Sequence, residues 1–333
     1  MVDYSNIAEV GIASIGGGTV PNQLMYPGLS QMIVEYAMPA QIFRQMYIHY
    51  PSMGRQAVTI PKEATPASMV GATTTGVIVG SRVGEGDEMP LNILPVTSDT
   101  VTTYKVGEGY QVTREMILFQ QVPIIQQRLK RLGITLGNTI DFDCAATVEA
   151  AVATTDSGIH TNVVSGKTKG LDNTVAVEAG TLGQYDFVDA KVRMMQNNLF
   201  ADTLIVQPKG AGHIAKLPQF KSYMNTGIVG GYAHGEIGNV EGLRVLVSRH
   251  SGAQAATNLV TDGINYVMTG TLTTAPNPLG QYTPMGYFVE SLPIQTMVQD
   301  NPRRDAYEVY ALCMFAPVVV TTNAIERLSG ATN

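Results

Sequence analysis

Residues 123–152 read PIIQQRLKRLGITLGNTIDFDCAATVEAAV, and the rest of the chain is organised around them. Apolar residues recur in this stretch at steps of three and four, which places them on one stripe of an α-helix. They are Ile125, Leu129, Leu132, Leu136 and Ile140. Gly133 and Gly137 each weaken a helix by about 1 kcal/mol relative to alanine, so packing of the stripe has to offset them. We predict a helix of about 30 residues and about 45 Å, here called the spine helix, on which the other layers rest.

The composition is that of a globular chain with few charges. Hydrophobic residues make up 44% of the 333 residues, whereas Asp, Glu, Lys and Arg together make up 14%, about half the usual share. This scarcity of charge indicates that much of the surface is buried in permanent interfaces. The formal net charge of −6 excludes the overall basic character of proteins that hold nucleic acid by electrostatic attraction.

Cysteine usage and the N-terminus indicate the compartment. Cys144 and Cys313 lie far apart in the sequence, and two lone cysteines in so long a chain favour buried thiols in a reducing compartment over a disulfide. No basic region precedes an apolar run at the N-terminus, so we expect no signal peptide. No run reaches the 18 or so apolar residues of a membrane span, so we expect no membrane partner.

The segment before the spine helix is predicted to be extended. Residues 57–60 and 76–80 read as short strands, and Val96 to Val106 reads as a longer one whose two faces are both semi-polar. Such strands describe a ribbon that projects from the body, with an acidic, turn-prone tip at residues 84–90. A two-stranded ribbon is marginal alone in water, so a partner surface has to hold it.

The remaining elements follow from caps and periodicity. Thr113 is the expected N-cap of a short helix, and Asp186 is the expected cap of a second helix. The buried stripe expected for this second helix is Val188, Val192, Met195 and Leu199. A buried strand is expected at 203–207, and residues 235–248 read as a strand, a turn at 241–242 and a second strand at 243–247. Two long strands are expected at 288–298 and 307–320, joined by a turn at 299–305. A short helical turn is expected at 324–328.

The chain shows no motif for catalysis, cofactors or metals. Residues 165–168 (SGKT) resemble the end of a phosphate-binding loop, but Thr161 occupies the position of its first glycine. The five histidines share no metal-ligand spacing. Asp143, on the spine helix, is expected to make a polar contact at a seam between subdomains. We therefore expect a protein without a catalytic site, cofactor or metal ion.

The order of these elements resembles the major capsid proteins of tailed double-stranded DNA viruses, which share the Hong Kong 97-type capsid fold. The stretch 82–90 (RVGEGDEMP) resembles their extended loop, and 104–117 resembles the return strand and the start of the spine helix. Residues 186–208 and 238–245 resemble the first helix and strand, and a later strand pair, of their axial domain. The resemblance covers roughly residues 30–328.

The resemblance implies an α+β fold in four parts. They are an N-terminal arm (1–50), an extended loop (51–112), a peripheral domain with the spine helix (113–160 and 286–316) and an axial domain (161–285 and 317–333). It also implies hexamers and pentamers that tile an icosahedral shell around double-stranded DNA, assembled in the host cytoplasm. A portal is implied as a partner, with scaffolding or cement proteins either separate or absent. The loop has no lysine between Lys62 and Lys105, so the lysine–asparagine crosslink of some relatives is not expected.

Two alternatives stay open. An encapsulin-type compartment shell has the same fold and encloses an enzyme, although the pronounced arm and the length favour a virus. A cytosolic enzyme with an unrecognised site would instead form a small oligomer with a concave pocket.

The acidic loop tip is the predicted site of a contact between subunits. Glu85, Asp87 and Glu88 lie within four residues, and like charges this close repel one another. The cluster is therefore suited to meeting cations on another subunit, and a solvated acidic turn is the alternative. The candidate cations lie on the spine helix and on the turn at 299–305: Arg128, Lys130, Arg131, Arg303 and Arg304.

Overall fold

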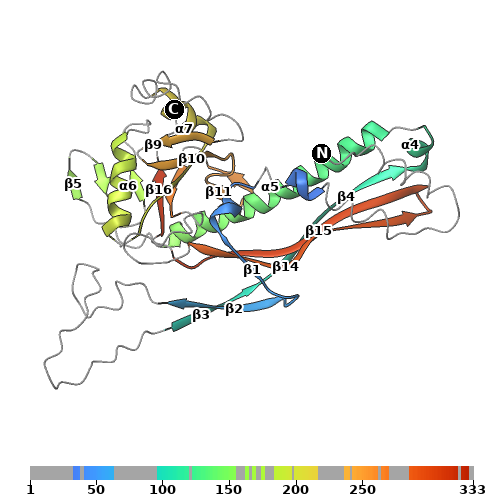
Figure 1. Cartoon of the computed structure of the whole chain (residues 1–333), viewed down its shortest axis with the longest axis horizontal. Helices are drawn as coiled ribbons and strands as arrows, with labels where there is room; N and C mark the ends of the chain where they lie inside the picture. Colours follow the sequence, from blue (N-terminus) through green and yellow to red (C-terminus); the bar gives the residue numbers. More distant parts are fainter. Residues whose placement is uncertain are drawn as a thin grey trace.

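The computed structural model of the chain describes residues 33–37, 41–63, 96–119, 122–154, 162–164, 167–169, 174–176, 184–196, 199–216, 236–240, 242–261, 264–269, 285–321 and 324–329. A long helix, a four-stranded sheet and a six-stranded sheet contain most of these residues. Figure 1 shows the helix lying along the four-stranded sheet and reaching the six-stranded sheet at its C-terminal end. The loop tip and the expected strand at 76–80 lie outside the described residues.

The spine helix is confirmed as α5 (Val122–Thr154), a helix of 33 residues. The described members of its apolar stripe are almost completely buried: Leu129, Leu132, Leu136 and Ile140. The two glycines have a packing role. A Cβ atom built at position 133 would lie 2.7 Å from the carbonyl oxygen of Ile33, and one at position 137 would lie 2.4 Å from that of Ala37. Glycine thus lets the helical turn at 33–37 lie directly on α5, and this contact offsets the lower helix propensity.

The four-stranded sheet contains the two longest strands. Its order is β1 (Ile48–Pro51), β14 (Gly286–Asn301), β15 (Ala306–Val319) and β4 (Tyr104–Thr113). The strands β14 and β15 confirm the predicted pair of long strands, and β1 joins β14 in parallel. Alternate side chains of β15 are buried, among them Val309, Ala311, Cys313 and Phe315. Because α5 packs against β15 and β4, this sheet and the helix share one core.

The ribbon ends earlier at its base than expected. Strand β2 (Ala57–Glu63) pairs antiparallel with β3 (Val96–Thr102), but the strand expected from Val96 to Val106 is divided at Thr103. Residues after Thr103 form β4, which pairs with β15 from Tyr104 to Thr113. The expectation that residues 104–106 project with the ribbon is therefore wrong. The long strand β15 offers residues 104–106 hydrogen-bond partners and an apolar face to pack on. The threonine-rich sequence gives no sign of this distant partner.

The six-stranded sheet is mixed. Its order is β7 (Thr174–Ala176), β16 (Ile325–Ser329), β13 (Ile264–Met268), β8 (Thr203–Val206), β10 (Leu243–Val247) and β9 (Glu236–Val240). Every residue of the central strands β8 and β13 is buried. The helical turn expected at 324–328 is wrong, because residues 325–329 pair with β13 on one side and β7 on the other. Pairing with β13 and β7 on its two sides outweighs the local helical preference of so short a segment.

The shorter elements complete the described chain. They are η2 (Phe43–Met46), α4 (Arg114–Leu118), β5 (Asn162–Val164), β6 (Lys167–Lys169), α6 (Gln184–Gln196), α7 (Pro208–Lys216), β11 (Ala253–Gln254) and β12 (Leu259–Val260). The Oγ1 of Thr113 accepts the N–H of Met116 at 3.4 Å, which confirms the expected cap of α4. Lys167 begins a strand, so the helix that a phosphate-binding loop requires does not follow it.

The expected cap and stripe of α6 are wrong. The helix begins at Gln184, two residues before Asp186, so Asp186 lies inside it. Its buried residues are Phe187, Ala190 and Met194, whereas Val188, Val192 and Met195 are exposed. Leu199, the fourth residue of the expected stripe, is buried as predicted, but it lies beyond the end of the helix at Gln196. Both sets have helical spacing and lie one or two residues apart, so periodicity alone cannot choose between them. The set that contains Phe187 covers the sheet, because an aromatic ring buries more apolar area than valine.

Both cysteines are free and buried, as the sequence predicts. Burial raises the pKa of the Cys144 thiol well above its ordinary value, and it raises the pKa of Cys313 to about 12. Both thiols therefore stay protonated at neutral pH, and a protonated buried thiol is a weak nucleophile.

We predict that Leu132→Asp yields insoluble protein or no assembled subunits. Leu132 is 0% exposed in the middle of the stripe, and an unpaired carboxylate there costs several kcal/mol. Soluble yield and sedimentation measure the effect. A suitable control is Ile134→Asp, because Ile134 is 43% exposed on the same helix. Wild-type yield from the Leu132 variant would contradict the burial of this stripe.

Candidate functional site

The N-terminal segment runs along one row of α5. The row consists of Gly133, Gly137 and Asp141, at steps of four residues, and the helical turn at 33–37 lies on its two glycines. Further along, the N–H of Phe43 donates to Oδ1 of Asp141 at 2.6 Å. The glycines give the segment room and the carboxylate binds its Phe43 N–H, so one helical row positions residues 33–37 and 41–47.

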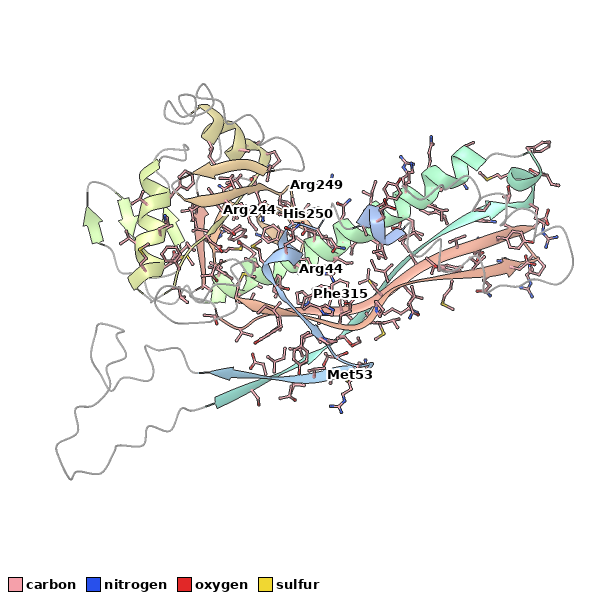
Figure 2. The ribbon with its side chains drawn as sticks, in the orientation of Figure 1. Arg44, Met53, Arg244, Arg249, His250 and Phe315 are labelled. Carbon is pink, nitrogen blue, oxygen red and sulfur yellow. The ribbon has the colours of Figure 1, made fainter. Side chains whose placement is uncertain are left out.

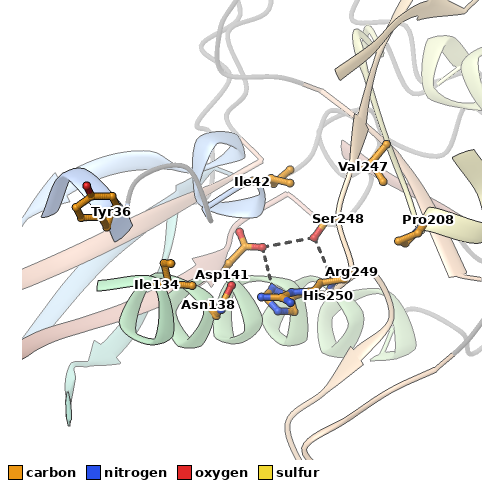
Figure 3. Close-up of a pocket in the computed structure, with 10 residues that line it drawn as sticks. All are labelled: Tyr36, Ile42, Ile134, Asn138, Asp141, Pro208, Val247, Ser248, Arg249 and His250. Carbon is orange, nitrogen blue, oxygen red and sulfur yellow. Dashed lines mark hydrogen bonds and ion pairs between the residues drawn. The ribbon is translucent and has the colours of Figure 1, made fainter. Parts of the chain in front are cut away.

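Asp141 also holds the six-stranded sheet. Its Oδ2 lies 3.0 Å from Nδ1 of His250 and 3.5 Å from Oγ of Ser248, in the loop after β10 (Figure 3). Asp141 is 1% exposed, so these contacts replace its hydration. Beside the carboxylate lies a groove of about 510 Å³, with walls from Tyr36, Ile42, Ile134, Asn138, Pro208, Val247 and Arg249.

The Ser–His–Asp grouping here is not a catalytic triad. In a triad the serine hydroxyl contacts the imidazole, which takes up its proton. Here the Ser248 hydroxyl contacts Asp141 and accepts the backbone N–H of His250 at 3.1 Å. The three side chains therefore join structural elements, and nothing in this geometry activates the hydroxyl.

A second carboxylate, near the C-terminal end of α5, binds two other strands. Tyr266 of β13 donates its hydroxyl to Glu149 at 2.5 Å, and Arg327 of β16 donates to the same carboxylate at 2.8 Å. Burial, together with the charge of Glu149, raises the pKa of Tyr266 well above its ordinary value, so the phenol keeps its proton and stays a donor. Asp141 thus joins the helix to the loop after β10, and Glu149 joins it to β13 and β16, so the helix is bound to two parts of the six-stranded sheet.

Asp143 makes a polar contact with the four-stranded sheet. Its Oδ2 accepts the hydroxyl of Tyr104, at the start of β4, at 3.0 Å. Burial raises the pKa of Asp143, as expected for a partly buried carboxylate. The sequence predicted a polar contact at a seam for Asp143, but the more buried contact belongs to Asp141, two residues earlier. Nearby, Tyr47 donates its hydroxyl to the carbonyl of Cys144 at 2.9 Å.

Hydroxyl groups hold the base of the ribbon. Ser291 Oγ lies 2.7 Å from Ser52 Oγ and 2.8 Å from Thr103 Oγ1, and it donates to the carbonyl of Arg55 at 2.7 Å. Pairing of β14 with β15 is irregular next to Ser291, between Glu290 and Leu292, as at a β-bulge. Met53, which has a positive φ of 53° and is 91% exposed, marks the turn into β2 (Figure 2). These contacts set the direction in which the ribbon leaves the sheet.

The predicted contact cations occupy two regions. Arg128 donates to the carbonyl of Gln111 at 2.7 Å, and the ammonium group of Lys130 lies 5.1 Å from the centre of the Tyr36 ring. Both side chains thus have partners within the chain. Arg131 is exposed on α5, and Arg303 and Arg304 are exposed in the turn after β14. Glu85, Asp87 and Glu88 lie outside the described residues, so their contact with any of these cations stays a prediction.

The sequence reasoning missed several of the residues that organise these contacts. Arg114 pairs with Asp300 at 3.3 Å and with Asp305 at 3.2 Å, across the far end of the four-stranded sheet. His49 lies 2.5 Å from Glu290 and His250 lies beside Asp141, so these two histidines are satisfied by carboxylates. The available signal for Asp141 was its position four residues after Gly137, on the row of the two glycines.

The described ranges contain neither a candidate metal site nor a helix suited to a membrane. No three His, Cys, Asp or Glu side chains gather to hold a metal ion there. Among the helices of the described segments, none is long and apolar enough to span a membrane.

We predict that Asp141→Ala lowers the free energy of unfolding of the unassembled subunit by about 1–3 kcal/mol, because buried donors lose their acceptor. Hydrogen exchange of residues 41–47 should accelerate in the same variant. Urea unfolding and exchange mass spectrometry measure these effects. Asp143→Ala is the matched control, since Asp143 holds one exposed hydroxyl contact and its loss should cost less. Equal effects of the two substitutions would show that Asp141 does not anchor the segment.

Solved structures place this fold among phage capsid structures. The chain is similar to the capsid structure of cyanophage P-SCSP1u, with 16% identity, a TM-score of 0.57, and 88% of this chain and 89% of that chain covered. It is similar to a phage-related protein of Bordetella bronchiseptica (12% identity, TM-score 0.57, 92% and 96% covered). It also matches the mature capsid of bacteriophage PhiM1 (13% identity, TM-score 0.54, 87% and 86% covered). No curated protein sequence matches the chain.

A family model described as phage capsid protein matches residues 97–327. The match contains β4, the spine helix, nearly all of β3 and, except for β1 and the end of β16, both sheets. At identities this low the solved structures bear on the fold alone, and they agree with the family model. The chain therefore belongs to the phage capsid protein family: it is a structural major capsid protein with the Hong Kong 97-type capsid fold.

Proposed function

We propose that this capsid protein assembles into hexamers and pentamers, which tile an icosahedral shell around double-stranded DNA. The observation that carries the proposal is the ribbon. In the described part of the chain, β2 and β3 pair only with each other, and a two-stranded ribbon is marginal alone in water. A neighbouring subunit in a shell supplies the surface that the ribbon lacks.

The proposed domain assignment follows the four parts expected from the sequence. The arm takes residues 1–50, the extended loop 51–112, the peripheral domain 113–160 and 286–316, and the axial domain 161–285 and 317–333. Pairing of β4 with β15 favours a loop that narrows to the ribbon and ends near Thr103. The peripheral role then belongs to the four-stranded sheet with α5, and the axial role to the six-stranded sheet.

The proposed partners are those of a shell. They are copies of the chain, a portal and, where present, separate scaffolding or cement proteins, with assembly in the host cytoplasm. The net charge of −6 favours DNA that is enclosed without sequence-specific binding, because tight binding needs many phosphate contacts from Lys and Arg. We propose no catalytic role.

We predict that the purified chain sediments as capsid subassemblies or as shells, and that electron microscopy shows uniform round particles. The physical reason is the low charge of the chain and the unsupported ribbon. Particles purified from infected cells should contain nuclease-protected DNA. An enzyme cargo in place of DNA would indicate an encapsulin-type shell. A stable monomer across micromolar concentrations would contradict the proposal.

We further propose that the acidic loop tip contacts cations of a neighbouring subunit. The candidates remain Arg128, Lys130, Arg131, Arg303 and Arg304. The existing contacts of Arg128 and Lys130 favour the exposed Arg131, Arg303 and Arg304. Arginine suits this role because it binds a carboxylate through two parallel hydrogen bonds.

We predict that Glu85→Lys combined with Glu88→Lys disrupts assembly while the subunit stays folded. Each exposed pair contributes only about 0–1 kcal/mol, but a shell repeats the contact in every subunit. Sedimentation and circular dichroism measure assembly and folding. Adding Arg303→Glu and Arg304→Glu should restore assembly if this turn is the partner. Normal shells from the lysine variant would contradict the contact.

A further inference from the structure

The two strands of the ribbon come from opposite edges of the four-stranded sheet. Strand β1 leads into β2 at one edge, and β3 leads into β4 at the other edge, with β14 and β15 between them. The two chains meet again in the ribbon, on the side of the sheet away from α5 (Figure 1). The subunit therefore joins two separated edges of one sheet into a single projecting element.

Both chains leave the sheet at the same row of paired residues. Pro51, the last residue of β1, pairs with Glu290 of β14. Glu290 pairs in turn with Phe315 of β15, and Phe315 pairs with Tyr104, the first residue of β4. Two connections on one line define an axis, and a body that is held only on an axis can rotate about it. A third contact, away from this row, is needed to fix the angle of the ribbon.

Ser291, one residue beyond this row, lies at a bulge of β14. Pairing with β15 is regular up to Glu290 and then skips Ser291 and Pro293. Proline has no N–H to donate to a neighbouring strand and is confined to the edges and bulges of sheets, so the sequence itself places an irregularity here. A bulge changes the direction of a side chain relative to a regular strand, and the side chain at this bulge is that of Ser291.

The Ser291 hydroxyl contacts both chains of the ribbon base. It lies 2.7 Å from Oγ of Ser52, the residue after β1, and 2.8 Å from Oγ1 of Thr103, the residue before β4. It also donates to the carbonyl of Arg55, in the turn before β2, at 2.7 Å. A hydroxyl donates one hydrogen bond and accepts two, so these three contacts use its full capacity. Ser52 and Thr103 are both buried, so removal of their shared partner leaves buried polar groups unpaired.

A small change of angle at this base displaces the ribbon far enough to matter for assembly. Strand β2 has seven residues, which corresponds to about 23 Å at about 3.3 Å per residue. A rotation of about 10° then moves the far end by about 4 Å, which is comparable to the separation at which two side chains are still in contact. In a closed shell the angle between neighbouring subunits also sets the curvature, so a ribbon with a loose angle permits more than one curvature.

We propose that Ser291 is the positioning residue that fixes the angle of the ribbon and thereby selects one diameter of the shell. The inference rests on the proposed shell function and adds the residue that controls the geometry of the shell. It does not depend on which surface of a neighbour the ribbon meets, and it is separate from the acidic loop tip.

The first test measures the angle in the unassembled subunit. Spin labels on Ser98→Cys in β3 and Gln299→Cys in β14 report the distance between ribbon and sheet, because both positions are exposed and the native cysteines are buried. With Ser291→Ala added, the distance distribution should become about twofold wider, because the ribbon can then rotate about its row. Ser291→Thr keeps the hydroxyl and should restore the original width.

Two further variants separate positioning from a general loss of stability. Thr102→Ala removes an exposed hydroxyl beside the cluster and should leave the width unchanged. Thr103→Val removes a second hydroxyl of the cluster while keeping the shape of the side chain, so it should widen the distribution as Ser291→Ala does. An unchanged width in Ser291→Ala, or in Thr103→Val where the alanine variant does not fold, would overturn the inference.

The second test measures the assembled particles. Electron microscopy of wild-type shells should show one diameter, whereas Ser291→Ala should give more than one diameter or open sheets. Ser291→Thr should restore the single diameter, which a merely destabilised subunit would not explain. If wild type forms no particles at all, the proposed shell function fails and takes this inference with it, whereas alanine shells that keep the single wild-type diameter overturn only this inference.

Discussion

A single helix row determines how the subunit is put together. Gly133, Gly137 and Asp141 recur every fourth residue along α5, and the N-terminal segment lies on them through carbonyl-to-glycine contacts and the Phe43 N–H. Because Asp141 also binds the loop after β10, the same row fixes the six-stranded sheet. Glu149, two turns further along, repeats this arrangement with β13 and β16.

Buried carboxylates suit this task better than further apolar contacts. Apolar packing is non-directional, so it would let the sheet slide or rotate against a straight helix at little cost. A carboxylate with several donors is satisfied in only one arrangement, and breaking it leaves buried polar groups unpaired. Asp141 and Glu149 therefore restrict orientation more than they add net stability, since the desolvation of a buried charge offsets much of its attraction to its partners.

The parts of the fold that the sequence predicts are those set by long periodic patterns. The spine helix and strands β14 and β15 have such patterns, and Thr113 carries a local cap signal. The misassigned elements depend on partners distant in the sequence: β4 on β15, and β16 on β7 and β13. Periodicity also cannot separate Val188 from Phe187, because both sets on α6 are helical in spacing. In the sequence, Asp141 and Asp143 differ only in the helix row to which they belong. Which row is buried depends on the segment that packs on it, and the helix sequence alone does not show that segment.

The ribbon base connects the geometry of one subunit with that of a shell. Its direction is set by small hydroxyls, Ser52, Thr103 and Ser291, whose short side chains leave little rotational freedom to lose. Apolar groups at this junction would not fix an angle, because they have no directional contact to make. A ribbon that contacts a neighbouring subunit has to leave its own subunit in a defined direction. Its remaining contacts then form only when the subunits assemble. Polar contacts within the chain thus set the direction of the ribbon, and in the proposed shell another copy of the chain stabilises it.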